Sequence, residues 1–420
     1  MRGVVLPAPL RIMAKTIAVI ASLDTKAKEV TYVLEGIRRL GYQTMVIDVG
    51  VRGEQPFKAD FGPEDVATAA GLAWSEIKAQ EKRVRITAMA RGLEALVPVL
   101  YAQGRFNAVL SLGGAQNTLM GTSAMRALPL GVPKLMLSTM ASGNRTFEPL
   151  VGTKDLMLMH SVADISGINL ITTSVLDNAV AAICGMAGHA GLAVQHPGHL
   201  VIGASMLGVT NDGVCRAASL LEESGFEVVT FHTTGAGGRA LEDLIREGLI
   251  GAVLDLTLHE IVCEFFGGYA SGANNRLIAA AEAGIPQVVT PGAADVVDYS
   301  VTALEGLPDW ETRPHIYQAP TILHLKLHPE ETVVIGSVIA ERLSASRGPV
   351  TVVWPRGGLH QFSFPNGPLW YPETDQALLR SLREGLRPDI QVIEVDANIN
   401  DPAFSEAASR AMLELLERRI

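Results

Sequence analysis

The sequence predicts an α/β protein with two Rossmann-like lobes, each built on a parallel sheet. Apolar, β-branched segments alternate with helical segments along the chain, which is typical of parallel sheets joined by crossover helices. Glycine is abundant and aromatic residues make up only 5% of the chain, a composition that suits strands buried on both faces. The pattern of strands and helices also occurs twice in the same order, which indicates an internal duplication.

The duplication rests on matching segments in the two halves of the chain. TIAVIAS at 16–22 corresponds to LVIGASM at 200–206, and the same separation divides Gly41 from Gly225, where a predicted helix ends. Three further pairs match: MVIDVG (45–50) with VVTFHTTG (228–235), NAVLSLGG (107–114) with GAVLDLTL (251–258), and GVPKLMLST (131–139) with GIPQVVTPG (284–292). We expect a ligand to bind in a cleft between two such lobes.

A chain of 420 residues suits two domains, which we place at 15–195 and 199–420 with a linker at 195–198. The net charge of −10 gives no bulk reason to bind nucleic acid. The apolar stretch 175–194 is expected to be a buried helix and not a membrane span. Three cysteines without a CxxC pair fit a cytoplasmic protein, and Met13 is a second candidate start.

In the first lobe, a strand at 16–22 leads into a helix at 26–40 that Asp24 or Thr25 can cap and Gly41 ends. Its residues Val30, Val33, Leu34, Ile37 and Leu40 have the spacing of one apolar helix face. The rest of the lobe is predicted as a strand at 44–49, an irregular stretch with short helices at 63–79, helices at 84–102, 118–128 and 174–193, and strands at 107–112 and 133–138.

The second lobe begins at Leu200 and repeats this pattern. Residues 296–330 are rich in proline and histidine and are predicted to be an irregular insertion, in which His315, His324 and His328 lie on the surface. The remaining elements are predicted as helices at 331–345, 373–385 and 401–418 and strands at 349–354 and 390–395, with a glycine turn at 357–358.

The loop Gly113-Gly114-Ala115-Gln116-Asn117-Thr118 is a candidate anion site. It follows a predicted strand and precedes a helix, whose free N–H groups favour phosphate or carboxylate. It matches neither the Rossmann fingerprint nor the P-loop, and a tight strand-to-helix turn explains the same residues equally well.

Two further strand ends carry groups that suit a nucleotide. Ser138 to Gly143 bring hydroxyls, although simple capping explains them too. In Asp24-Thr25-Lys26, Asp24 suits Mg²⁺ and Lys26 suits phosphate, while a helix cap and a solvated lysine are the structural alternative. Gly50 closes the second strand, a position that often faces a ribose in doubly wound folds.

The second lobe offers a weaker candidate site. His259-Glu260 begins an HExxH-like run that fails, because Cys263 replaces the second histidine. Glu260 and Arg276, with Gly267 and Gly268, suit an anionic ligand, although a capped helix with a charged face is an equal alternative. Asp295 is a candidate ligand contact or general base.

Six motifs resemble the two-domain ATP-binding family named after a tomato mosaic virus resistance protein, over about residues 15–395. They are SLDTK (22–26), DVG (48–50), GGAQNT (113–118), LPLGVPKLMLSTMASG (128–143), SVADISGIN (161–169) and GGYASGANNRL (267–277). The resemblance implies two Rossmann-like lobes, a homodimer, and a nucleotide held by the first lobe. The nucleotide contacts it implies are Asp24, Thr25, Gly113, Gly114, Asn117, Thr118, Thr139, Ser142 and Gly143. His259 departs from it, since the family usually has threonine there.

We therefore expect a cytoplasmic, homodimeric ATP-binding protein with Mg²⁺ at Asp24 and the phosphates on Gly-rich strand-end loops of the first lobe. The alternative is an enzyme that uses ATP to act on a small carboxylate or phosphate metabolite, with Glu260, Arg276 and Asp295 as catalytic groups.

Overall fold

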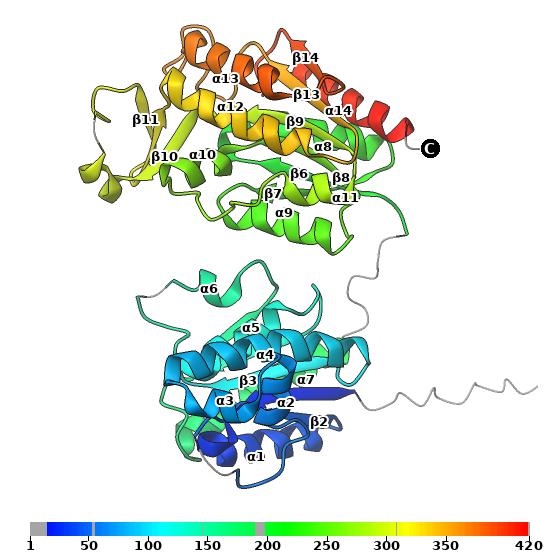
Figure 1. Cartoon of the computed structure of the whole chain (residues 1–420), viewed down its shortest axis with the longest axis vertical. Coiled ribbons are helices and arrows are strands. Elements are labelled where there is room, and N and C mark those ends of the chain that lie inside the picture. Colours follow the sequence, from blue (N-terminus) through cyan, green and yellow to red (C-terminus); the bar gives the residue numbers. More distant parts are fainter. Residues whose placement is uncertain (1–14, 53–54, 145, 190–197, 308, 419–420) are drawn as a thin grey trace, which may run out of the picture. The chain divides into compact units, whose positions relative to one another are not determined.

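The computed structural model describes residues 15–418 except 53–54, 145, 190–197 and 308. The chain divides into two compact units, one up to residue 195 and one from residue 196, and each is described by itself (Figure 1). Met13 and most of the predicted linker lie outside the described residues.

The first unit is built on a five-stranded parallel sheet with the order β2-β1-β3-β4-β5. Its strands are β1 (Thr16–Ala21), β2 (Gln43–Asp48), β3 (Ala108–Gly113), β4 (Lys134–Ser138) and β5 (Met157–His160). Its helices are α1 (Leu23–Arg39), α2 (Pro63–Ala69), α3 (Trp74–Ala79), α4 (Lys82–Ala102), α5 (Ala115–Arg126), α6 (Glu148–Val151) and α7 (Leu170–His189).

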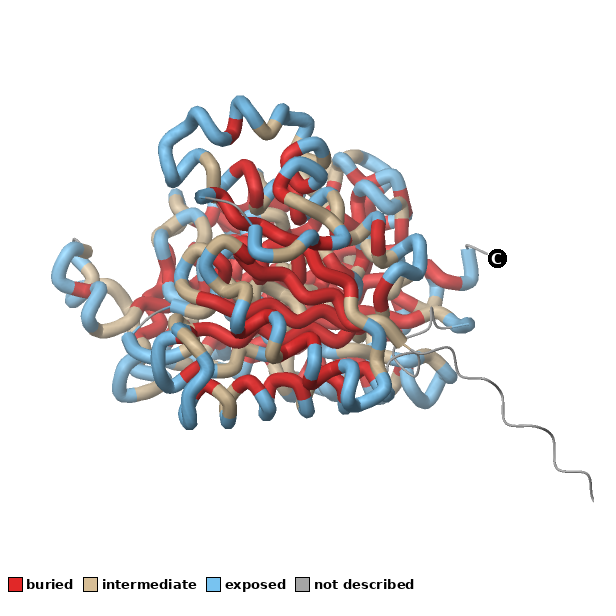
Figure 2. The backbone as a smooth tube through the Cα atoms, turned by 90° about the horizontal axis from the view of Figure 1, so that it is seen from below, coloured by how far each residue is buried: buried red, intermediate tan, exposed pale blue. Residues whose placement is uncertain are grey.

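Both faces of this sheet are covered by helices. Along β1, Ile17 and Val19 pack into the apolar cluster formed with α1 and α7, whereas Ala18 and Ile20 pack into the cluster formed with α2, α4 and α5. Because side chains alternate across a strand, an uninterrupted apolar run supplies two cores. In Figure 2 the strands are coloured as buried, and the helices around them have exposed turns.

The second unit contains a six-stranded parallel sheet with the order β14-β13-β9-β8-β6-β7. Its strands are β6 (Val201–Met206), β7 (Glu227–His232), β8 (Ala252–Thr257), β9 (Gln287–Gly292), β13 (Val350–Pro355) and β14 (Gln391–Val395). Helices α8 (Asn211–Glu223) and α14 (Pro402–Glu417) cover one face. The other face carries α9 (Ala236–Arg246), α10 (His259–Phe266), α11 (Ile278–Ala283), α12 (Pro329–Ser344) and α13 (Pro372–Gly385).

The two sheets share one strand order. Counting only the strands of each parallel sheet, both run second, first, third, fourth, fifth, and the sheet of the second unit adds β14 beyond the fifth strand. The predicted fold of two Rossmann-like lobes with parallel sheets is therefore confirmed, and the common order agrees with the matching segments in the sequence.

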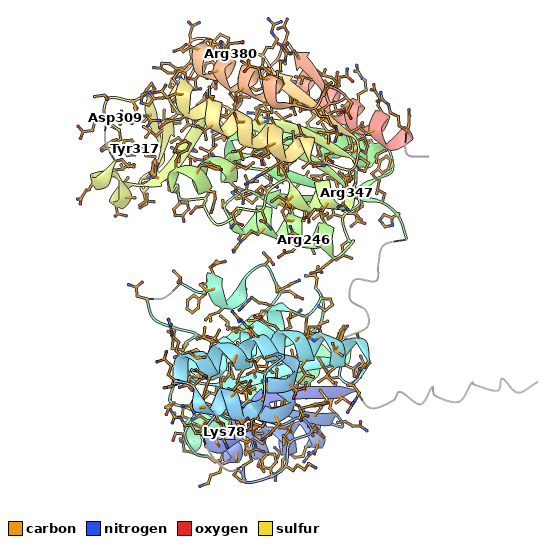
Figure 3. The ribbon with its side chains drawn as sticks, viewed as in Figure 1. Lys78, Arg246, Asp309, Tyr317, Arg347 and Arg380 are labelled. Carbon is orange, nitrogen blue, oxygen red and sulfur yellow. The ribbon has the colours of Figure 1, made fainter. Side chains whose placement is uncertain are left out.

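Two local predictions were wrong, and one strand was not predicted. Residues 296–326 are not irregular: β10 (Val296–Ser300), β11 (His315–Ala319) and β12 (Ile322–Lys326) form a small antiparallel sheet. Tyr317 is exposed on its outer strand, and Asp309 lies in the loop before it (Figure 3). Strand β5 had no predicted counterpart. Helix α1 begins at Leu23 after Ser22, with a non-helical backbone at Lys26, so neither Asp24 nor Thr25 caps it.

Helix α7 is the one described helix long and apolar enough to cross a membrane by length and composition. Leu176, Val180 and Ile183 on it are buried in the core against the first sheet. One face of α7 packs on the sheet, while Leu170 and Ile171 at its start are exposed, so the helix predicted to be buried is buried on one face only.

Candidate functional site

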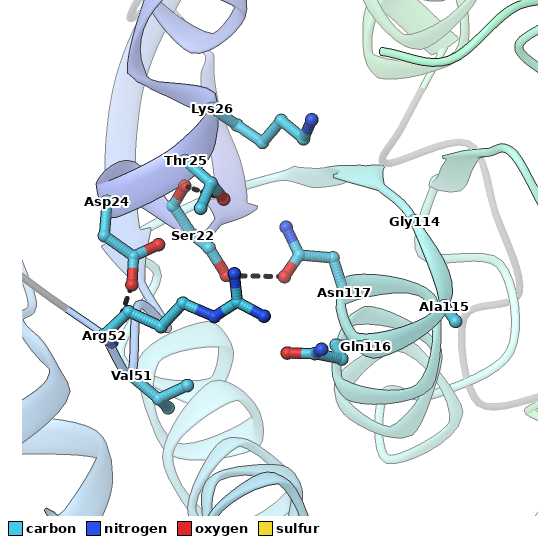
Figure 4. Close-up of a pocket in the computed structure, with 10 residues that line it drawn as sticks. All are labelled: Ser22, Asp24, Thr25, Lys26, Val51, Arg52, Gly114, Ala115, Gln116 and Asn117. Carbon is cyan, nitrogen blue, oxygen red and sulfur yellow. Dashed lines mark hydrogen bonds between the residues drawn. The ribbon is translucent and has the colours of Figure 1, made fainter. Parts of the chain in front are cut away.

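The first unit has a pocket of about 230 Å³ at the carboxyl ends of β1, β2 and β3 (Figure 4). This is the edge where α/β sheets bind ligands, next to the point where the strand order reverses between β1 and β3. The lining residues are Ser22, Asp24, Thr25, Lys26, Val51, Arg52, Gly114, Ala115, Gln116 and Asn117.

Hydrogen bonds between buried side chains fix the shape of this pocket. Ser22 Oγ donates to Asn117 Oδ1 at 2.6 Å, and Asn117 Nδ2 donates to Leu112 O at 3.0 Å. Thr118 Oγ1 lies 2.6 Å from Ser138 Oγ and donates to Gly114 O. The side chains of Asn117 and Thr118 therefore hold the ends of β1, β3 and β4 together, and the hydroxyl of Thr118 is not available to a ligand.

Two carboxylates lie at the entrance to helix α1. Asp48 Oδ1 accepts hydrogen bonds from the N–H groups of Leu23 (2.8 Å) and Gly50 (2.9 Å), and burial raises the pKa of Asp48 above its usual value. Asp24 Oδ2 accepts from Arg52 N at 2.8 Å. Asp24 Oδ1 and Asp48 Oδ2 are buried and have no hydrogen-bond partner among the described residues. Buried carboxylate oxygens of this kind attract a cation.

Cationic and amide groups face the same space. Lys26 Nζ donates to Ile165 O, which ties the loop before α7 to the pocket rim. The Arg52 guanidinium reaches across the pocket toward Gln116 and Asn117 (Figure 4). Helix α5 begins at Ala115, after Gly114, so its first-turn N–H groups lie at the pocket and its dipole favours an anion there.

The other residues predicted to bind the nucleotide lie around the pocket, not in its lining. A Cβ on Gly113, with φ 151°, would lie 2.6 Å from Asn117 Cβ, so this glycine permits the turn. Gly50 packs against the Asp24 carboxylate. Thr139 Oγ1 lies 3.7 Å from where a Cβ of Gly114 would sit. Ser142 and Gly143 are exposed in the following loop.

In the second unit, Glu260 and Arg276 are completely buried and bind each other. Arg276 Nε lies 2.8 Å from Glu260 Oε2, and its two terminal nitrogens bind Asp255 at 2.7 and 3.1 Å. Glu260 Oε1 also accepts from Gly235 N (2.6 Å) and Gly238 N (3.0 Å) at the start of α9. Burial opposes the charge of Arg276, but Asp255 and Glu260 raise its pKa above the usual value. These groups are occupied by the protein itself.

Asp295 lies in a second buried cluster, beyond the carboxyl end of β9. Its Oδ2 lies 2.5 Å from Lys326 Nζ and 3.2 Å from His360 Nε2, and Lys326 also binds Asp375 at 3.0 Å. Burial favours the neutral acid, but Lys326 and His360 hold the pKa of Asp295 below its usual value. Burial raises the pKa of Asp375 to about 7 despite the nearby Lys326.

His259 and His324 share the carboxylate of Asp298 beside this cluster, at 3.1 and 2.5 Å. His259 Nδ1 lies 3.0 Å from Ala293 O, and Nε2 lies 3.2 Å from Cys263 Sγ and close to Asp298. Burial opposes a charge on this ring, but Cys263 and Asp298 raise the pKa of His259 well above its usual value. The prediction that His324 lies on the surface was wrong, since its exposed fraction is 1%. Strand β12 is buried on both faces, since Leu323 and Leu325 pack into the apolar core while His324 meets Asp298 and Phe362.

Several residues of these sites were missed from the sequence. Arg52 and Ser22 line the first pocket but were not predicted as contacts, and Gln116 was part of the candidate loop without being singled out. Their place just after strands β1 and β2 or at the start of α5 was the available signal. Lys326 and His360 were missed because no local motif joins them to Asp295. The alternating segment ILHLK at 322–326 was the signal for a strand that places His324 and Lys326 on one face.

Comparison with known proteins gives matches over both units. The N-terminal domain of the Uncharacterised protein family (UPF0261) matches residues 15–191, and the C-terminal domain of the same family matches residues 199–416. A UPF0261 protein of Clostridium tetani is 38% identical over 97% of this chain and 100% of its own length. The ToMV resistance protein Tm-1(GCR237) of Solanum lycopersicum is 31% identical over 94% of this chain and 55% of its own length.

Solved structures resemble this chain only weakly. The UDP-N-acetylglucosamine 2-epimerase of Rickettsia bellii is 12% identical, with a TM-score of 0.23, over 66% of this chain and 79% of that one. A similarity of this size carries no argument about what the chain binds.

Proposed function

We propose that the first unit of this chain, which belongs to the uncharacterised protein family UPF0261, binds the phosphate groups of a nucleotide. The proposed ligand is ATP with Mg²⁺. This membership confirms the resemblance seen in the sequence motifs. One observation carries the proposal: a pocket at the strand ends joins the start of α5, two cationic side chains and an unpaired carboxylate oxygen. The family resemblance favours ATP over other phosphate-bearing ligands.

The residues present fit the proposed ligand. The first-turn N–H groups of α5 and the cations Lys26 and Arg52 suit phosphate oxygens, since backbone amides and charged donors make the stronger hydrogen bonds to anions. Asp24 Oδ1, which has no partner among the described residues, suits Mg²⁺, an ion often held by one or two carboxylates together with phosphates. A bound Mg²⁺ would neutralise phosphate charge beside Asp24.

Gly114→Val tests the proposal. A Cβ at Gly114 would meet only Thr139 Oγ1, at 3.7 Å, and its φ of −85° suits valine, so the variant is expected to fold. We expect ATP with Mg²⁺ to raise the melting temperature of the wild type, because a ligand that binds the folded state stabilises it. The variant should lose that rise, since valine fills part of a pocket of about 230 Å³.

Gly185→Val is the matched control. Gly185 is exposed on α7 and a Cβ there meets nothing, so this variant should keep the full response to ATP. A wild type that shows no ATP-dependent rise contradicts the proposal, and so does a Gly114→Val variant with an undiminished rise.

A second candidate function is an enzyme that uses ATP on a small carboxylate or phosphate. The buried cluster of Asp295, Lys326 and His360 favours it, because strongly shifted pKa values gather at functional sites. The test is release of ADP by the full chain in the presence of such metabolites. Turnover that Asp295→Asn removes, while the ATP-dependent melting rise persists, supports an enzyme. A wild type without turnover argues against it.

We also propose a homodimer, as the family resemblance implies, and a cytoplasmic location, which the three cysteines without a CxxC pair fit. Light scattering on the purified full chain tests the oligomeric state, and a monomer at micromolar concentration contradicts the homodimer. Fractionation of the producing cells tests the cytoplasmic location.

A further inference from the structure

The second unit contains a larger pocket that the proposed function does not use. It has a volume of about 630 Å³ and lies beyond the carboxyl ends of β13 and β14, beside the first turn of α8. A volume of this size is within the range of small-molecule sites. The glycine turn at 357–358, noted in the sequence, forms part of its wall.

Two asparagines hold this pocket in a fixed shape. Asn398 Nδ2 donates to three carbonyl oxygens, those of Gly357, His360 and Ser363, at 3.2, 3.3 and 2.8 Å. Asn400 binds Val209 O and the N–H of Gly213, which joins the loop after β14 to helix α8. The pocket is therefore built by bonds between distant parts of the unit, and little ordering is needed when a ligand enters.

The ionisable groups on the wall are mainly negative. Asp212, Asp396 and Asp401 line the pocket together with one cation, Arg356. Arg356 already lies 3.2 Å from Asp396 and 3.7 Å from Glu394 outside the lining, so its charge is largely balanced within the protein. The remaining field in the pocket is that of carboxylates, and it favours a cationic ligand.

Aromatic rings supply the apolar part of the wall. Phe364 is 44% exposed and Trp370 is half-buried, and both line the pocket. Gly367 makes room for the Phe364 ring, since a Cβ there would lie 2.9 Å from two ring carbons. Aromatic faces next to carboxylates are the arrangement that recognises an organic ammonium group, through cation–π attraction.

We propose that this pocket binds an organic cation, an ammonium group carried on a small apolar body. The rings of Phe364 and Trp370 would contact its methylene or methyl groups. The net negative charge of the wall, to which Asp212 and Asp396 contribute, would balance its charge. The site is independent of the nucleotide pocket in the first unit, so each can be tested without the other.

The probe is choline, compared with 3,3-dimethylbutan-1-ol, which has the same shape and no charge. Calorimetric titration of the full chain should show saturable choline binding at least about tenfold tighter than that of the alcohol, since about 1.4 kcal/mol corresponds to tenfold. Phe364→Leu keeps apolar bulk but removes the ring, and should weaken choline and not the alcohol. Asp396→Asn should weaken choline about threefold, by the loss of one screened charge.

Asp389→Asn is the matched control, because Asp389 is also exposed and pairs with an arginine but lies outside the pocket lining. It should leave choline binding unchanged, and Gly114→Val in the first unit should do the same. Equal affinity for choline and the alcohol overturns the proposal. So do the absence of saturable choline binding and an unchanged affinity in Phe364→Leu.

Discussion

Replacing Arg276 with methionine should destabilise the second unit strongly. Arg276 has no exposed surface and binds Asp255 through two nitrogens, at 2.7 and 3.1 Å, and Glu260 at 2.8 Å, with Glu242 at 3.6 Å. Methionine fills much of the same volume but leaves three buried carboxylates without their cation. Removing one partner of a buried ion pair costs about 3–5 kcal/mol, and we expect a loss at the upper end of that range.

The loss should depend on pH in a defined direction. Burial already raises the pKa of Glu242 in the folded protein, and Arg276 opposes this, so the pKa of Glu242 rises further when Arg276 is replaced. When the pKa of a group is higher in the folded than in the unfolded state, the free energy of unfolding falls as pH rises above the unfolded-state pKa. That pKa is about 4 for a glutamate side chain. The variant should therefore be closest to the wild type near that pH and furthest from it above neutrality.

Urea denaturation followed by tryptophan fluorescence measures this effect, because Trp310, Trp354 and Trp370 report on the second unit and Trp74 alone on the first. Arg383→Met is the control, since Arg383 is exposed and pairs with Glu394 at the surface, where an ion pair contributes about 1 kcal/mol or less. If Arg276→Met costs no more than this control, or costs more at low pH, the ion network does not have the stabilising role assigned to it.

Three further predictions concern single substitutions. Asn117→Ala should lower the free energy of unfolding of the first unit by about 1–3 kcal/mol, measured by urea denaturation, because Leu112 O loses its buried donor. Gly92→Ala should destabilise the same unit by a similar amount, since its Cβ would lie 2.1 Å from Val66 O. Burial raises the pKa of Asp375 to about 7, so this group makes the wild type lose stability as pH rises from about 4 to about 7. Asp375→Asn should remove that part of the pH dependence, and an unchanged slope would contradict the assignment.

The parallel sheets could be predicted from the sequence because each strand is an unbroken apolar run buried on both faces. TIAVIA became β1 and AVLDLT became β8, within a residue or two of the predicted bounds. The antiparallel sheet at 296–326 was missed because its strands are short and bounded by proline and histidine, the composition of a loop. Its buried His324 and Lys326 are stabilised by distant acids, which no local pattern reveals.

The candidate site could be predicted in position but less well in detail. Glycines and polar residues after β1 and β3 located the strand-end pocket, because the carboxyl ends of neighbouring parallel strands meet at one edge. Which side chains face that pocket depends on tertiary contacts. Thr118 turned toward Ser138, while Arg52, from a polar stretch with no motif, lines the cavity.

The carboxylate of Glu260 accepts hydrogen bonds from the amides at the start of α9, and this affects which of the two units can bind a ligand at its sheet edge. It acts as a permanently tethered occupant, at an effective concentration that no diffusing metabolite can match. A metabolite in solution therefore cannot bind to these amides at the start of α9. The comparable sheet edge of the first unit has an open pocket of about 230 Å³, so under the proposed function it is at this edge that ligand concentration would change the unit's stability.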